Sequence, residues 1–540
     1  MTTSVNDGDP VPAAEPVAVP LSIPVQRRTA LLAGGGVLAA AVLSGCGPND
    51  SHADGPSGTA KPPTSGNRPP TGAPTRTAKP VPADWPALAR SLDGELLRPQ
   101  DRGYALHRNL YNTRFDGLRP AALAYVTGEA DIRACLDFAR RTATPLAIRS
   151  GGHSYAGWSS GNGKLVVDVS KLHSIRVDGT TATVGAGARL IDVYSQLGQH
   201  GRTIPGGSCP SVGVAGLTLG GGHGVMSRSM GLTCDNLIGA TIVTADGRTR
   251  EVSADAEPDL FWALRGAGNG NFGVVTSLRF GTHPVPEVVT GYLTWPWSRA
   301  AAVVRAWQSW GPDQPDHIWS ALHLDCAAGG SPTVAIPMLS TGSKADLAAA
   351  ADRLAASVGA DATSVSLHPH SYIDATFSYA GCSGLTAAQC HLTPEGGLHR
   401  ETYSACSDFY DTNLSAGGID TLLAQVQRLS GQSGGGAGSI ALTALGGAVN
   451  RPSPTSTAFC HRTSRFLAQY LASDALSLTS WLSTTHAALR RYASGAAYQN
   501  YTDPTLPTWR TAYYGPNAPR LTTLKSHYDP QRLFTFPQAL

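Results

Sequence analysis

The spacing of apolar residues predicts short strands and helices in irregular order between Asp84 and Phe280. The predicted strands cover residues 121–126, 145–148, 165–169, 181–184, 241–244, 248–252 and 273–280. The predicted helices cover residues 129–141, 189–200 and 259–265. Asp246-Gly247 predicts a hairpin turn between two of the strands. This irregular alternation favours an α+β domain over a regularly alternating parallel sheet.

The pattern changes after Pro284. Apolar stretches at 333–338 and 439–445 predict further strands, and alanine-rich amphipathic segments at 344–357 and 419–429 predict helices. We expect a second α+β domain here. From Tyr498 onward the chain is again rich in aromatic residues, Asn and Pro.

Length and charge narrow the function classes. The chain has 540 residues, enough for two folded domains with tails, and a formal net charge of +3. Because it contains no long basic run, nucleic-acid binding is not expected.

The first 83 residues do not have the pattern of a folded domain. Arg27-Arg28 precede an apolar run from Ala30 to Leu43, which has the length of a signal sequence and is too short for an ordinary transmembrane helix. The run leads into Leu43-Ser44-Gly45-Cys46, a lipobox in which Cys46 would carry lipid. The twin arginine favours export of an already folded protein. The alternative is a cleaved signal with an incidental cysteine. Residues 47–83 predict a disordered linker.

The chain contains nine cysteines. Outside the cytoplasm some can pair, and Cys382 with Cys390 is the most natural pair. No Cys/His spacing indicates zinc, so no metal site is expected.

Two residues set among glycines carry the candidate chemistry. His153 lies in Arg149-Ser150-Gly151-Gly152-His153-Ser154-Tyr155, and Cys209 lies in a segment from Gly206 to Gly213 that runs on to Gly220-Gly221-Gly222-His223-Gly224. An imidazole and a thiolate are nucleophiles, and glycine lets the backbone approach a ligand closely. Together they could hold one flavin at two points. The alternatives are a loop histidine bonded to backbone and a buried structural thiol.

With these motifs and a C-terminal Tyr498-Gln499-Asn500-Tyr501, the chain resembles the berberine-bridge-enzyme-like branch of the vanillyl-alcohol-oxidase flavoproteins. The resemblance extends over residues 84–540 and includes Asp529-Pro530-Gln531-Arg532-Leu533-Phe534. It implies a two-part, PCMH-type FAD-binding domain from residues 84–282 and 490–540. A substrate-binding domain of residues 283–489 would be inserted between the two parts.

The resemblance also implies site residues. FAD would be bicovalently attached, at its 8α-methyl group through His153 and at C6 through Cys209, and the pyrophosphate would lie on backbone amides of residues 150–154. The residues expected to bind the cofactor are Arg149, Ser150, Gly151, Gly152, His153, Ser154, Gly207, Cys209, Val212, Gly213, Gly220, Gly221, Val274 and Asn500.

Catalysis needs a base that takes a hydroxyl proton while hydride leaves the same carbon. The same resemblance implies that Tyr501 occupies the family's base position and that Tyr498 lines the flavin beside it. A tyrosine can act in this way if nearby positive charge or an electron-poor flavin depresses its pKa. The alternative is that both tyrosines are core packing residues.

Two positions depart from relatives. Leu445 stands where several sugar oxidases have a second polar catalytic residue, and Asn450 stands near the position of a glutamate in plant alkaloid enzymes. We therefore expect a single-base oxidation of an alcohol or hemiacetal carbon in a sugar, an oligosaccharide or a hydroxylated secondary metabolite. In relatives, a small residue at the position of Val212 leaves room for O2 beside the flavin, so the resemblance favours O2 as the acceptor; the alternative is that Val212 only packs. The alternatives are a dehydrogenase with another acceptor and a weakly active flavin-carrying surface protein.

Overall fold

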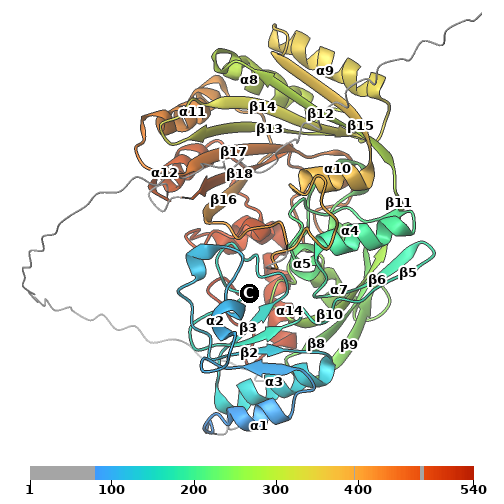
Figure 1. Cartoon of the computed structure of the whole chain (residues 1–540), viewed down its shortest axis with the longest axis vertical. Coiled ribbons are helices and arrows are strands. Elements are labelled where there is room, and N and C mark those ends of the chain that lie inside the picture. The colour runs from blue at the N-terminus through green and yellow to red at the C-terminus, as the bar shows by residue number, and fades with distance from the viewer. Residues whose placement is uncertain (1–78, 394–395, 475–478) are drawn as a thin grey trace, which may run out of the picture. The chain divides into compact units, whose positions relative to one another are not determined.

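The computed structural model describes residues 79–393, 396–474 and 479–540 (Figure 1). The predicted signal, Cys46 and most of the predicted linker lie outside these residues. Within the described part of the chain, no helix combines the length and the apolar character needed to cross a bilayer. The residues from Pro80 to Leu540 form one compact unit. Its first helix begins at the predicted start of the fold, where the Asp84 carboxylate accepts a hydrogen bond from the Ala87 amide at 3.0 Å.

A four-stranded sheet holds the first part of the chain, in the order β1-β2-β4-β3. Strands β2, β4 and β3 are parallel, and β1 is antiparallel to β2. Every residue of β2 and β4 is buried, as expected for parallel strands covered on both faces. The elements are α1 (Trp85–Arg90), β1 (Glu95–Leu97), α2 (Tyr104–His107), β2 (Ala122–Tyr125), α3 (Glu129–Thr142), β3 (Leu146–Arg149) and β4 (Leu165–Asp168).

A five-stranded antiparallel sheet follows, in the order β5-β6-β10-β8-β9. The predicted hairpin is confirmed, because β8 pairs with β9 and Gly247 adopts a φ of 80° in the turn. Helix α3 contacts both β4 and β8 and so bridges the two sheets. The elements are β5 (Ile175–Asp178), β6 (Thr181–Gly185), α4 (Leu190–Gln199), β7 (Arg202–Thr203), α5 (Val214–Leu219), α6 (Ser227–Met230), β8 (Leu237–Thr244), β9 (Thr249–Ser253), α7 (Pro258–Leu264), β10 (Gly273–Gly281) and β11 (His283–Pro284).

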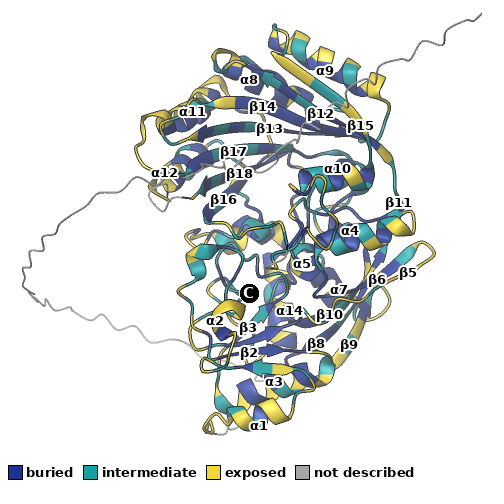
Figure 2. Cartoon of the chain, viewed as in Figure 1, coloured by how far each residue is buried: buried dark blue, intermediate teal, exposed yellow. Residues whose placement is uncertain are grey.

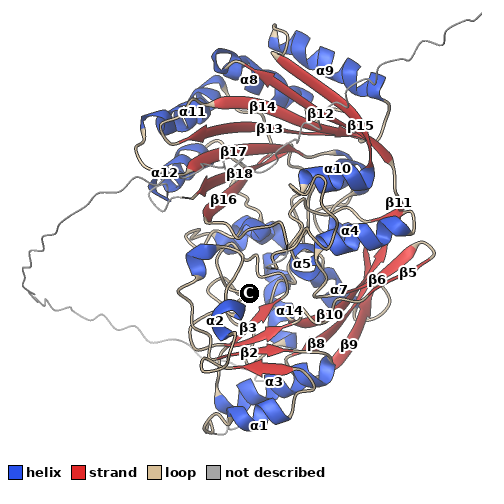
Figure 3. Ribbon diagram, in the orientation of Figure 1, coloured by secondary structure: helices blue, strands red, loops and turns tan. Residues whose placement is uncertain are grey.

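The third sheet has seven antiparallel strands, in the order β15-β12-β14-β13-β17-β18-β16 (Figure 3). Helices α8, α9, α11 and α12 pack on one face and bury a core around Trp307 (Figure 2). Helix α10 contacts β12 and β15 at one end of the sheet, and it also contacts α4. The elements are β12 (Glu287–Trp295), α8 (Ala300–Trp310), β13 (Ile318–Ala327), β14 (Thr333–Ser340), α9 (Lys344–Val358), β15 (Ser364–Ser371), α10 (Tyr372–Tyr379), β16 (Tyr403–Tyr410), α11 (Ala416–Gln427), β17 (Ala437–Ala444), β18 (Phe466–Ser473) and α12 (Thr479–Arg490).

The C-terminal segment returns to the first core. Helices α13 (Trp509–Tyr514) and α14 (Ala518–Tyr528) contribute buried residues to the same apolar cluster as β2, β4 and β10. Lys525 of α14 is fully buried and donates hydrogen bonds to Asp529 at 2.7 Å and to the Asn271 carbonyl at 2.6 Å. The C-terminal helices and the strands of the first two sheets therefore share one apolar core, although they are far apart in the sequence. The predicted disulfide between Cys382 and Cys390 is present.

The predicted elements differ from the observed ones mainly at their ends. The helix predicted at 419–429 begins three residues earlier, at Ala416, because Ser415 caps it by accepting a bond from the Gly418 amide at 3.2 Å. The helix predicted at 344–357 is confirmed as α9, with a reciprocal cap between Ser343 and Asp346.

Candidate active site

The two glycine-flanked motifs of the sequence meet backbone to backbone. A Cβ atom at Gly151 would lie 2.1 Å from the Gly213 nitrogen, and one at Gly213 would lie 2.0 Å from Ser150 Oγ. Neither position has room for a side chain, so glycine is required at both. The loop that carries His153 leaves β3 at Arg149, whose guanidinium pairs with Asp168 at the end of β4, and both side chains are almost fully buried. The ends of two parallel strands thus fix this loop.

His153 is held on two sides. Its Nε2 lies 2.9 Å from Ser211 Oγ, and its ring stacks on Tyr111 with 3.9 Å between centroids. Burial lowers the pKa of His153 to about 3, and the charge of Arg189 adds to the decrease. The imidazole is therefore neutral near pH 7 and keeps a nucleophilic nitrogen.

Cys209 is exposed, and no hydrogen bond engages its thiol among the described residues. The surrounding protein still displaces enough water to raise the pKa of this thiol to about 11, and the Glu401 carboxylate adds to the increase. Tyr111 interacts electrostatically with both Cys209 and Glu401. The tyrosine that stacks on His153 is therefore also a neighbour of the thiol.

The described residues around these loops fit a dinucleotide. Several buried polar atoms have no hydrogen-bond partner there, although such atoms are normally paired. They include Asn109 Oδ1, Arg149 Nη1, Ser159 Oγ, Ser160 Oγ, Arg189 Nη1 and Asn269 Oδ1. Two guanidinium groups and a set of hydroxyl and amide groups suit the pyrophosphate and polyol of FAD. The cradle of Gly151 and Gly213 adds the close backbone approach that such a ligand needs.

The other predicted cofactor-binding residues occupy different environments. The Gly207 carbonyl accepts a bond from the Tyr194 hydroxyl at 2.8 Å, and Val212 is partly buried against the first core. A Cβ atom at Gly220 would lie 2.0 Å from Asn500 Oδ1, and Gly221 has a φ of 127°. Val274 is fully buried in β10 and packs in the core. Their roles in binding FAD stay predictions.

Tyr498 and Tyr501 differ in how their hydroxyls are bonded. Tyr498 Oη accepts bonds from the Gly222 amide at 2.7 Å and from Asn500 Nδ2 at 2.9 Å, which fixes that side chain. Tyr501 Oη has one partner among the described residues, Nε2 of His223 at 2.8 Å. The oxygen of Tyr501 thus retains capacity for a substrate hydroxyl.

The protein groups around Tyr501 do not depress its pKa. Burial raises the pKa of Tyr501 well above its usual value, and Tyr498, Cys209 and Tyr403 raise it further. The sequence could not reveal this, because the largest cause is burial, which depends on how the fold packs around the side chain.

The structure brings several aromatic and polar side chains into the site that the sequence did not predict. Tyr155 packs 5.2 Å from Tyr501 and 5.1 Å from Tyr403, centroid to centroid, and its hydroxyl accepts a bond from Gln469 at 2.9 Å. Tyr155 and His223 belong to the motifs quoted above and could have been noted there. Tyr403 and Gln469 lie on β16 and β18 and carry no local signal, because their placement depends on the register of the seven-stranded sheet.

The two departures from relatives have different surroundings. Leu445 is buried in an apolar cluster that contains Tyr498 and contacts Tyr501. Leu445 therefore belongs to the apolar cluster against which Tyr501 packs. Asn450 donates to the Ser464 carbonyl at 3.0 Å and leaves its own carbonyl oxygen buried without a partner in the described structure.

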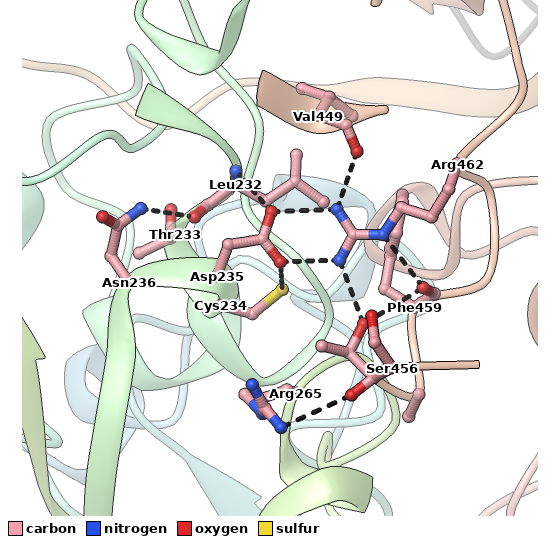
Figure 4. A network of polar contacts seen from close by, with 12 residues as sticks. Leu232, Thr233, Cys234, Asp235, Asn236, Arg265, Val449, Ser456, Phe459 and Arg462 are labelled. Atoms are coloured by element: carbon pink, nitrogen blue, oxygen red, sulfur yellow. Dashed lines mark hydrogen bonds and ion pairs between the residues drawn. The ribbon is translucent and has the colours of Figure 1, made fainter. Parts of the chain in front are cut away.

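A buried ion pair holds the segment after the glycine run (Figure 4). The Arg462 guanidinium bonds both oxygens of Asp235, at 2.6 and 2.9 Å, and donates to the Val449 carbonyl at 3.0 Å. The amides of Thr233 and Cys234 bond the carbonyls of the run's glycines, each at 2.9 Å. This network connects the glycine run to the inserted region.

Comparisons with known proteins agree with this geometry. Residues 120–253 match the family model "FAD binding domain", and residues 497–540 match "Berberine and berberine like". YgaK of Bacillus subtilis, named an uncharacterised FAD-linked oxidoreductase, is 30% identical over 83% of this chain and 97% of its own length. The chain belongs to the berberine-bridge-enzyme-like family of FAD-linked oxidoreductases.

A characterised relative and a solved structure are also similar to this chain. A chitooligosaccharide oxidase of Gibberella zeae is 30% identical over 80% of this chain and 89% of its own. The solved structure of BBE-like 1 from Physcomitrella patens superposes with a TM-score of 0.77 at 30% identity, covering 84% of this chain and 98% of that one. The predicted α+β, PCMH-type fold with FAD as cofactor is confirmed, and the chain is an FAD-linked oxidoreductase.

Proposed function

We propose that this protein is an oxidase that removes two electrons from an alcohol or hemiacetal carbon of a sugar or oligosaccharide, with O2 as the final acceptor and H2O2 as a product. The observation that carries the proposal is the position of Tyr501 near Cys209. Among the described residues, its hydroxyl oxygen has one hydrogen-bond partner, His223. Relatives named chitooligosaccharide and glucooligosaccharide oxidases favour carbohydrate as the substrate class.

FAD supplies a hydride acceptor, which no side chain can provide. His153 and Cys209 would hold it covalently at two points, and Arg149 and Arg189 would lie near its phosphates. Tyr501 would take the proton of the substrate hydroxyl while hydride leaves the same carbon. Small Val212 supports O2 over another acceptor.

The covalent links have a direct test. Acid-precipitated protein should stay yellow, and its peptide map should contain one FAD joined to two peptides. The variant His153→Ala should keep the cysteinyl link, and Cys209→Ala should keep the histidyl link. Complete release of flavin on denaturation would contradict bicovalent attachment.

The base has a separate test. Tyr501→Phe should retain fold and covalent flavin but slow flavin reduction by a panel of disaccharides on the order of 10²–10⁴-fold. Reoxidation by O2 should be unchanged, because Tyr501 acts before it. Reduction within about twofold of wild type would remove Tyr501 from this role. Oxygen uptake during turnover distinguishes an oxidase from a dehydrogenase.

We also propose that the protein works outside the cytoplasm, anchored by lipid on Cys46. The lipobox and the twin arginine of the sequence support this location. Wild-type protein should partition with membranes, and Cys46→Ala should release it or block its maturation. Soluble wild-type protein that starts beyond residue 46 would favour a cleaved signal instead.

A further inference from the structure

His223 has no role in the function proposed so far, although it contacts the proposed base directly. Its Nε2 lies 2.8 Å from Tyr501 Oη. Its ring also meets Tyr498 and Tyr501 edge-on, with centroids 5.4 and 5.5 Å away. The flanking backbone is fixed, because the Gly222 amide bonds Tyr498 Oη and the Gly224 amide bonds Ser227 Oγ at 2.8 Å. The imidazole is therefore held in place against the phenol.

The environment of Tyr501 creates a chemical problem for a base. Burial and neighbouring ionisable groups raise its pKa well above the ordinary value, so the phenol is neutral near pH 7. A neutral phenol can accept a proton from a substrate only if it gives up its own proton at the same time. Some neighbour must receive that proton.

His223 is a suitable neighbour. Burial lowers the pKa of its imidazole to about 4, so the ring is neutral near pH 7 and offers one nitrogen lone pair. The titratable groups that face it are Tyr498 and Tyr501, both from the C-terminal segment. Tyr498 is already bonded by two donors. The acceptor capacity of Nε2 is thus directed to Tyr501.

Proton transfer from the substrate to Tyr501 requires one direction of the hydrogen bond between Tyr501 Oη and His223 Nε2. If Nε2 carried the hydrogen, the hydroxyl hydrogen of neutral Tyr501 would face the substrate and block proton transfer to the oxygen. If Tyr501 donates to Nε2, its oxygen lone pairs face outward and the imidazole hydrogen lies on Nδ1. Nδ1 is buried and has no partner among the described residues.

We propose that His223 is a positioning residue that orients the Tyr501 hydroxyl and receives its proton during substrate oxidation. The substrate hydroxyl proton passes to Tyr501 Oη as the phenol proton passes to His223 Nε2, and the hydride leaves the same carbon for FAD. The carbon–oxygen bond becomes a carbonyl, and the imidazole becomes an imidazolium that later loses its proton to solvent. This inference rests on Tyr501 being the base.

The tautomer of His223 provides a test that needs no substrate. Nitrogen-15 NMR of histidine-labelled holoenzyme, with His223→Gln to assign the signal, should find hydrogen on Nδ1 and none on Nε2 near neutral pH. A hydrogen on Nε2 would overturn the relay, whatever the substrate proves to be.

Kinetics provide the second test. Anaerobic flavin reduction by cellobiose, diacetylchitobiose or xylobiose should depend weakly on pH above about 5 in wild type, because His223 is neutral there. In His223→Gln the rate should fall on the order of 10²–10⁴-fold near pH 7 and rise about tenfold per pH unit, because ionised Tyr501 must then act alone. A pH-independent loss would indicate packing only and would overturn the relay.

Two comparisons separate this inference from the proposed function. His461 is also buried with a pKa lowered to about 4, so His461→Gln controls for replacing a buried histidine. It should leave the pH profile unchanged. In a Tyr501→Phe background, His223→Gln should cause no further loss. If Tyr501→Phe reduces its flavin normally, the base assignment fails. If Tyr501→Phe is slow but His223→Gln reduces its flavin like wild type, the base assignment stands and the proton relay through His223 is wrong.

Discussion

Replacing Arg462 with Met should destabilise the protein more than any loss of a surface ion pair. The side chain of Arg462 is 1% exposed and that of Asp235 is 13% exposed, so the pair is shielded from water. In Arg462→Met, Asp235 keeps its bond from the Leu232 amide at 2.9 Å but loses both guanidinium bonds. The Val449 carbonyl loses a donor as well.

Removing one partner of a buried pair typically costs about 3–5 kcal/mol of unfolding free energy, because it leaves an uncompensated charge. Unfolding entropy grows with chain length, so in a chain of this size each kcal/mol shifts the melting temperature by about 1 °C, and we expect a fall of roughly 3–5 °C. Urea titration of the holoenzyme followed by tryptophan fluorescence would measure the loss. Arg451→Met is the matched control, because Arg451 pairs with Asp316 at the surface and is 65% exposed. That variant should lose less than about 1 kcal/mol.

The double variant Arg462→Met/Asp235→Asn tests the cause. A neutral amide at residue 235 can still accept the Leu232 hydrogen bond and carries no charge, so the double variant should be more stable than Arg462→Met alone. If Arg462→Met costs no more than Arg451→Met, or if the double variant recovers nothing, the reasoning from the buried charge is refuted.

Two further predictions concern the loops and the pH range. Gly213→Ala should abolish covalent attachment of flavin and lower stability, because the added Cβ would lie 2.0 Å from Ser150 Oγ. Gly216→Ala is the control and should keep its covalent flavin, because no heavy atom lies within 4 Å of a Cβ at that position. Burial lowers the pKa of His461 to about 4, so between pH 6.5 and 4 this histidine is protonated in the unfolded chain but still neutral in the folded protein. The free energy of unfolding should therefore be unaffected by His461 above pH 6.5 and should fall by about 3 kcal/mol as the pH decreases to 4. Denaturant titration across this range should find that loss reduced in His461→Gln.

Local signals account for the parts of the fold that the sequence predicted well. The hairpin of β8 and β9 follows from Asp246-Gly247, and the disulfide of Cys382 and Cys390 follows from a short separation. Strand β3 leads directly into the loop of His153, as its apolar pattern predicted. In each case the signal lies in residues that are close together in the sequence.

The rest of the site depends on contacts between distant segments. Gln469 reaches Tyr155 across 314 positions, and His223 reaches Tyr501 across 278. No pattern within either segment predicts such a pairing, because it requires the register of the seven-stranded sheet and the return of the C-terminal segment to the first core. The motifs predicted which loops form the site, and the fold decided which side chains complete it.

The pKa of Tyr501 illustrates why this distinction matters for mechanism. The motif alone indicates only that Tyr501 can act as the base if nearby positive charge or an electron-poor flavin depresses its pKa. Burial acts in the opposite direction, and the charges that could offset it would have to come from other segments. The chain instead brings a neutral imidazole against the phenol. Acid–base chemistry in this site is therefore a property of the pair, and a substitution of either residue should change the pH dependence of the other.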